Sequence, residues 1–150
     1  KVTSTYLLRG DGGCGNWGEL SAPLDVVPDT EPSGCFTQPT LAISALIYRL
    51  SGDYNPLHAD PEVAKQAGFD KPILQGLCTY GVACLSIVRA LCGNNASKLK
   101  SMGARFTKPV YPGETIKMEY WLESGGEVKF RCISVERDVV VLDRGRALIV

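Results

Sequence analysis

The residues best suited to chemistry lie in the segment 51–58, which reads Ser-Gly-Asp-Tyr-Asn-Pro-Leu-His. It contains the single histidine of the 150-residue sequence, His58, preceded by the carboxylate of Asp53 and the amide of Asn55. Histidine transfers protons near neutral pH, and an adjacent carboxylate orients its ring or acts as the base itself. An extended turn of this length brings Asp53 and His58 within reach of one water, which Asn55 can orient by donating and accepting hydrogen bonds. The residue types of this segment therefore fit acid–base chemistry on a water molecule.

Two other interpretations of the same segment remain open. Asp53 and Asn55 are common turn formers, so His58 also fits a solvated position in an ordinary loop. Ser51 raises a Ser-His-Asp triad, but with all three residues in one short segment the geometry of nucleophile, base and orienter is difficult to reach. Spacing alone favours the solvated turn over a catalytic dyad.

Gly76 is the second candidate, because it lies where a strongly apolar segment begins. The first N–H groups of a helix have no partner within the helix, and the positive end of its dipole lies there. A glycine at this position lets a ligand carbonyl approach closely, which makes an oxyanion hole feasible. A plain helix-entry glycine fits the same pattern.

Periodicity predicts the elements that must position these residues. Helices are expected from Thr37, as N-cap, to Gly52, from the Asp60-Pro61 pair to Gly68, and from Gly76 to Cys92. The third of these is apolar on nearly every side, which is typical of a helix at the centre of a domain. Strands are expected at Thr3–Arg9, Lys98–Lys108, Ile116–Leu122, Val128–Cys132 and from Val139 to Leu142.

Turn residues separate the last strands. Tyr111-Pro112-Gly113 is expected to form a turn, and Gly125-Gly126 marks a hairpin. Asp143-Arg144-Gly145 fits either a turn or a bulge within one longer strand ending at Val150. A nearly all-apolar helix needs a sheet that can wrap around it, so the pattern predicts an α+β domain.

Composition narrows the function classes. Hydrophobic residues make up 45% and charged residues 21%, as in an ordinary single globular domain. The formal net charge is zero, so there is no global basic field for nucleic acid or an anionic membrane surface. No apolar run approaches the roughly 18 residues that span a bilayer. Nucleic-acid and membrane partners are therefore not expected.

Two further motifs are interpreted as structural. The six cysteines are expected to be core residues rather than disulfides, since several lie in apolar helical or strand patterns. One histidine and no Cys-x-x-Cys pair argue against a metal site. Gly10-x-Gly12-x-x-Gly15 matches a dinucleotide fingerprint, but Trp17 and a proline series follow where the required helix would begin. This motif is expected to be a glycine loop.

One long signature is found in the segments Tyr48–His58 with Asp60, Pro61 and Ala64, Ala67–Leu74, Gly76–Thr79, Ala104–Phe106 and Lys108–Gly113. In these segments the chain resembles the hydratase 2 family, the MaoC-like (R)-specific 2-enoyl-CoA hydratases. The resemblance covers residues 37–150 well, and the chain is most similar to the C-terminal catalytic half of the eukaryotic enzymes. Residues 10–32 depart from the family pattern.

For the fold, the resemblance implies one hot-dog domain over residues 1–150, in which a long antiparallel sheet wraps the helix Gly76–Cys92. It also implies that Asp138–Val150 is one strand. A homodimer, or pairing with a second, non-catalytic hot-dog domain, is implied as well, and the start at Lys1 without a methionine suggests a fused arrangement. A peroxisomal location follows from the resemblance alone.

For the chemistry, the resemblance implies reversible hydration of a trans-2-enoyl-CoA to a (3R)-3-hydroxyacyl-CoA in fatty acid β-oxidation. Asp53 and His58 would hold the water and handle its proton, and Asn55 would orient it. The Gly76 N–H would polarise the thioester carbonyl, while Arg105 and Lys108 would bind the phosphates of CoA. No metal or redox cofactor is implied, because the thioester supplies the activation.

Two alternatives to the hydratase stay open. A thioesterase on the same fold would use the aspartate to assist hydrolysis, and would release free CoA. A non-catalytic acyl-binding half of a double hot-dog protein would need none of Asp53, Asn55 and His58, so their presence together argues against it.

Overall fold

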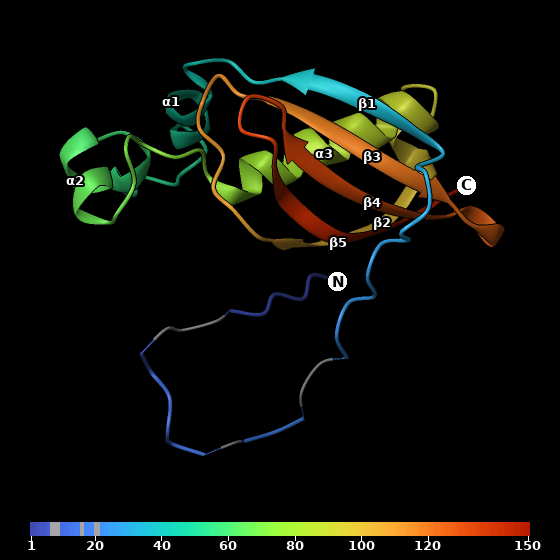
Figure 1. Ribbon diagram of the computed structural model, residues 1–150, viewed down its shortest axis with the longest axis horizontal. Helices are drawn as coiled ribbons and strands as arrows, with labels where there is room; N and C mark the ends of the chain where they lie inside the picture. The colour runs from blue at the N-terminus through green and yellow to red at the C-terminus, as the bar shows by residue number, and fades with distance from the viewer. Residues whose placement is uncertain (7–9, 16, 20–21) are drawn as a thin grey trace.

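The computed structural model describes residues 1–6, 10–15, 17–19 and 22–150, and its main body is a curved antiparallel sheet (Figure 1). The five strands lie in the order β1-β3-β4-β5-β2, so that β1 and β2 form the two edges. The strands are β1 (Gly34–Pro39), β2 (Leu99–Phe106), β3 (Thr115–Leu122), β4 (Glu127–Ser134) and β5 (Val139–Ile149). The helices are α1 (Ser44–Arg49), α2 (Pro61–Gln66) and α3 (Gly76–Leu91), with short 3₁₀ turns η1 (Pro56–His58), η2 (Ala96–Lys98) and η3 (Ser124–Gly126).

Helix α3 packs against one face of the sheet, and the core lies between them. In β3 the fully buried Ile116 and Met118 alternate with the more exposed Lys117, as expected for a strand with one face on a core. Ala83 and Ile87, four residues apart, bring the buried side of α3 onto that face. The predicted α+β class is therefore confirmed, with helix α3 packed against a long antiparallel sheet.

Helix α3 is not enclosed on every side, contrary to the expectation from its composition. Leu77 is 65% exposed and Leu85 is 40% exposed. These two residues are eight apart and lie on the same side of the helix. The sheet covers only the opposite side, so one apolar face of the helix remains uncovered in this chain.

The first predicted helix is wrong over its first part. Thr37 is not an N-cap but lies in β1, paired with Lys117 of β3, and the helix begins only at Ser44. The N-terminal strand prediction is also wrong where it can be assessed, because residues 3–6 form no strand and residues 7–9 lie outside the described residues. Long-range pairing with β3 makes residues 34–39 the edge strand instead.

The remaining elements agree with the sequence predictions. Asp60 caps α2 by accepting hydrogen bonds from Glu62 N (2.8 Å) and Val63 N (3.4 Å). Gly125-Gly126 joins β3 to β4, and Gly113, at φ +94°, closes the turn before β3. Cys92 and Cys132 are buried in the core, as expected, but Cys78 and Cys84 are only partly buried, and the core prediction is wrong for Cys14 and Cys35, which are exposed.

The open question at residues 143–145 is settled as a bulge in one long strand, β5. The pairing of β5 with β4 shifts register between Phe130 and Cys132, opposite this segment. Gly145 sits so close to β4 that a Cβ atom would lie 2.4 Å from the carbonyl oxygen of Phe130. A glycine is needed here because the two backbones approach too closely for a side chain.

Among the helices of the described residues, none is long and apolar enough to cross a membrane.

Candidate active site

The loop after α1 is folded by its own polar side chains. Asn55 caps η1, because its Oδ1 accepts a hydrogen bond from Leu57 N at 3.0 Å. The backbone N–H of Asn55 in turn donates to Asp53 Oδ1 at 3.3 Å. Both are local turns in which a short polar side chain bonds to the backbone two residues on. They fix the loop so that Asp53 and His58 face each other.

His58 is held in one orientation by its Nδ1 atom, which lies 2.8 Å from the carbonyl oxygen of Ile73. A carbonyl oxygen only accepts, so Nδ1 carries the hydrogen and the neutral ring has a free Nε2. That Nε2 lies 3.9 Å from Asp53 Oδ2, too far for a direct hydrogen bond. The spacing suits a bridging water. The His58 side chain is 12% exposed and that of Asp53 42%, so the pair lies at the border of solvent.

Gly76 is the first residue of α3 and shares a pocket with His58. The pocket has a volume of about 290 Å³ and is predominantly apolar. Its lining residues are His58, Phe69, Ile73, Leu74, Gly76, Thr79, Phe106, Thr107, Lys108, Pro109 and Val110. A proton-transfer group and the N-terminus of a 16-residue helix therefore face the same space.

The structure brings together some of the residues predicted from sequence and leaves others outside. His58, Gly76 and Lys108 line the pocket, and Asp53 stands beside His58. Asn55 is exposed on the loop, and its Oδ1 is engaged in capping, which leaves its amide N–H groups as the part that can meet a water. Arg105 is exposed on the edge strand β2 and does not line the pocket.

The sequence reasoning missed Phe106. A Cβ atom on Gly76 would lie 3.3 Å from Cε1 of Phe106, so this ring stands directly over the start of α3. Strand periodicity contains the signal, since successive side chains of a strand point to opposite faces. Phe106, the last residue of β2, lines the pocket together with the two residues that follow it, whereas Arg105 does not, but the charge of Arg105 favoured it over Phe106. Among the described residues, no group of three or more His, Cys, Asp and Glu side chains is placed to hold a metal ion.

Comparison with known proteins gives the family. The sequence family described as the MaoC-like domain matches residues 23–144 of the chain. The 3-hydroxyacyl-thioester dehydratase Y of Mycobacterium tuberculosis is 49% identical, over 97% of this chain and 52% of its own length. The peroxisomal enoyl-CoA hydratase 2 of Arabidopsis thaliana is 42% identical, over 93% of this chain and 48% of its own.

The fold comparison agrees with this. The crystal structure of a MaoC-like dehydratase from Phytophthora capsici superimposes with a TM-score of 0.83 at 41% identity, over 88% of this chain and 46% of that one. The chain spans about half the length of the curated relatives it matches. Because the family match covers most of the chain and the fold agrees, the chain belongs to the MaoC-like dehydratase family and has its hot-dog fold.

Proposed function

We propose that this domain catalyses the reversible hydration of a trans-2-enoyl-CoA to a (3R)-3-hydroxyacyl-CoA. The observation that carries the proposal is the position of the free Nε2 of His58. It lies 3.9 Å from Oδ2 of Asp53, and His58 lines the same pocket as Gly76. The relatives named as a thioester dehydratase and an enoyl-CoA hydratase support the same reaction in its two directions.

The mechanism follows from the positions of these groups. A water held between Asp53 and His58 loses a proton to this pair as its oxygen adds to C3 of the substrate. The pair returns a proton to C2, so that hydration consumes one water and leaves the thioester intact. The N–H at Gly76 donates to the thioester carbonyl oxygen and stabilises the negative charge that develops there. Asn55 donates an amide N–H to the same water.

The reaction is proposed to need no metal or redox cofactor, because conjugation with the thioester already makes C3 of the substrate electrophilic. The CoA phosphates require cations at the mouth of the pocket. The position of Lys108 in the pocket lining supports this role for it, and Arg105, which does not line the pocket, is the second proposed phosphate ligand.

A second hot-dog domain, either another copy of this chain or a non-catalytic one, is the proposed partner. The edge strand β2 is hydrogen-bonded on one side only, which is a template for further pairing. On the helical side, Leu46 and Ile47 of α1 and Leu50, which directly follows it, are 52%, 49% and 82% exposed. A small pocket lined by Ile47 and Cys78 joins this surface to α3. Apolar surface of this kind marks an interface.

Light scattering with size exclusion tests the pairing. The parent chain is expected to elute as a species larger than its 16.2 kDa monomer, or to do so once a partner hot-dog domain is added. Leu46→Asp should weaken this association, because it places a charge in the apolar contact. Val135→Asp is the matched control, since Val135 is 50% exposed on the turn between β4 and β5. A fully active monomer would contradict the proposal.

A peroxisomal location is proposed from the name of the Arabidopsis relative, whereas the mycobacterial relative is bacterial. Fractionation of the source cells, with an antibody to this domain, tests it. Recovery in another compartment would contradict a peroxisomal role while leaving the proposed reaction unaffected.

Incubation with crotonyl-CoA tests the reaction. The enoyl absorbance should fall, the product should be (3R)-3-hydroxybutyryl-CoA, and a thiol reagent should detect no free CoA. Release of free CoA would instead favour the thioesterase, and an unchanged substrate, with the partner domain supplied, would favour a non-catalytic acyl-binding domain.

A further inference from the structure

A partly buried ion pair lies behind the pocket wall, between the buried Glu114 and the half-buried Arg137. Glu114 is 7% exposed, and Arg137 comes from the connection between β4 and β5. Arg137 Nη2 donates to Glu114 Oε2 at 2.9 Å, and its Nε donates to Oε1. Tyr111 N also donates to Glu114 Oε2, at 3.0 Å. Neither charged residue lines the pocket.

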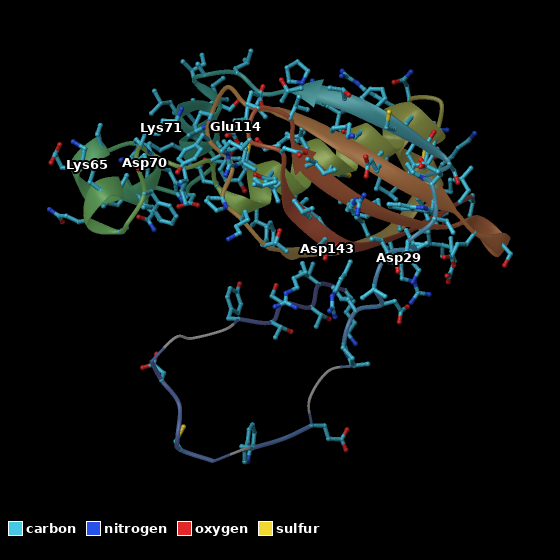
Figure 2. The ribbon with its side chains drawn as sticks, viewed as in Figure 1. Asp29, Lys65, Asp70, Lys71, Glu114 and Asp143 are labelled. Carbon is cyan, nitrogen blue, oxygen red and sulfur yellow. The ribbon has the colours of Figure 1, made fainter. Side chains whose placement is uncertain are left out.

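Arg137 also holds the pocket wall itself. Its Nη2 donates to the carbonyl oxygen of Pro109 at 2.6 Å, and both Pro109 and Val110 line the pocket. The Arg137 guanidinium lies 5.0 Å from the centre of the Tyr111 ring, and Lys71 Nζ lies 5.1 Å from the same centre. Figure 2 shows Lys71 and Glu114 at the end of the domain that carries α1 and α2.

Backbone hydrogen bonds connect this wall to His58. Leu74 N donates to the carbonyl oxygen of Val110 at 2.7 Å. The residue before Leu74 is Ile73, whose carbonyl oxygen accepts the Nδ1 hydrogen of His58 at 2.8 Å. The path from the ion pair to the imidazole therefore consists of one guanidinium, two short backbone segments and three hydrogen bonds.

We propose that Arg137 is a positioning residue for the reaction. By holding Pro109 and Val110, it sets the place of the Ile73 carbonyl and so keeps His58 in the tautomer that is protonated at Nδ1, with the free Nε2 toward Asp53. The role in catalysis rests on the proposed function, but the effect on the histidine does not. A lysine can neutralise Glu114 but, as a single ammonium on a flexible stem, cannot reproduce the planar fork that reaches Glu114 and Pro109 together.

The nitrogen NMR spectrum of the single histidine tests this directly, in protein without a histidine tag and at a pH well above the midpoint of its titration. The parent protein should show a protonated Nδ1 and a free Nε2. Arg137→Lys should show a mixture of the two tautomers. Its kcat for crotonyl-CoA should fall between about 10- and 100-fold, with KM changed far less, as expected for a misplaced catalytic group.

Arg131→Lys is the matched control. Arg131 Nε donates to Glu119 Oε2 at 2.8 Å, and its guanidinium lies 5.5 Å from the centre of the Trp121 ring, so it has the same kinds of partner away from the pocket. This control should keep the parent tautomer and the parent kcat. A purely structural role for Arg137 predicts reduced thermal stability with an unchanged histidine spectrum.

A second variant provides the same test if Arg137→Lys does not fold. Glu114→Gln combined with Arg137→Met removes both charges, so no buried charge is left unpaired, and the new amide oxygen can still accept from Tyr111 N. The mixed tautomer and the reduced kcat are expected here as well. A parent-like histidine spectrum in either folded variant would overturn the proposal, whether or not the parent protein hydrates crotonyl-CoA. A tautomer change in a protein without hydratase activity would refute only the proposed function.

Discussion

Replacing Gly76 with alanine is expected to remove most of the hydration activity without unfolding the domain. The added Cβ would lie 3.3 Å from Cε1 and 3.6 Å from Cδ1 of Phe106, and the first distance is tighter than an ordinary van der Waals contact. The ring must then move by a few tenths of an ångström, and the methyl group occupies the approach of the thioester carbonyl to the helix N-terminus. Helix α3 itself should not suffer, because alanine is favoured over glycine in a helix by about 0.5–1 kcal/mol.

The size of the effect follows from the donor that is lost. Removing one oxyanion-hole donor costs about 10²–10³-fold in kcat. A methyl group obstructs the carbonyl without deleting the N–H, so Gly76→Ala is expected at the lower end, about 10²-fold. Valine adds two further methyl groups facing Phe106, and Gly76→Val should abolish turnover. Steady-state kinetics with crotonyl-CoA, alongside thermal melting followed by circular dichroism, measure both quantities.

Gly81→Ala is the control within the same helix. Apart from its chain neighbours and the backbone of its own helix, no heavy atom lies within 4 Å of a Cβ at Gly81, so this change should leave kcat unchanged and should not lower the melting temperature. Parent-like kcat in folded Gly76→Ala would refute the assignment of the oxyanion donor to this helix end.

Two further predictions concern charged residues. Lys108→Ala should raise KM for crotonyl-CoA with little change in kcat. This rise in KM should exceed that caused by Arg105→Ala, because only Lys108 lines the pocket. A larger rise in KM for Arg105→Ala in steady-state kinetics would exclude Lys108 as the main phosphate ligand. Burial would raise the pKa of Glu114, but hydrogen bonds from Arg137 and Tyr111 N outweigh this and hold the pKa below its ordinary value of 4.5. The unfolded chain then binds more protons than the folded one, so this stabilisation is present above pH 4.5 and is lost as the pH falls through the folded pKa. Glu114→Gln should therefore lose less stability than the parent over this acidic range in thermal melts, and equal losses would contradict the assignment.

Local signals account for the elements that the sequence predicted well. The cap at Asp60, the glycines of the β3–β4 hairpin and the apolar run of α3 each act within a few residues. The edge strand β1 was missed because its partner β3 lies about 80 residues later, and nothing local to Thr37 signals this pairing. The uncovered face of α3 was missed for a related reason, since composition shows that a helix is apolar but not on how many sides it is packed.

The sequence predicted residues of the candidate site, but not which atoms they contact or hydrogen-bond to. The spacing of Asp53 and His58 indicated a shared water, and the structure adds which ring nitrogen is free through the bond from Nδ1 to the Ile73 carbonyl. That bond joins residues 15 apart through the folded pocket, so no pattern in the sequence contains it. The same is true of Phe106 over Gly76 and of the contact between Arg137 and Pro109.

A double-mutant kinetic cycle at Asp53 and His58 tests the central claim, that both groups act on one water. Asp53→Asn and His58→Ala should each lower kcat for crotonyl-CoA hydration by at least about 10²-fold, as expected for loss of an acid–base group. The double variant should be little slower than either single one, because groups that act as a unit are strongly non-additive. Full activity in either single variant, or losses that multiply in the double variant, would contradict the account.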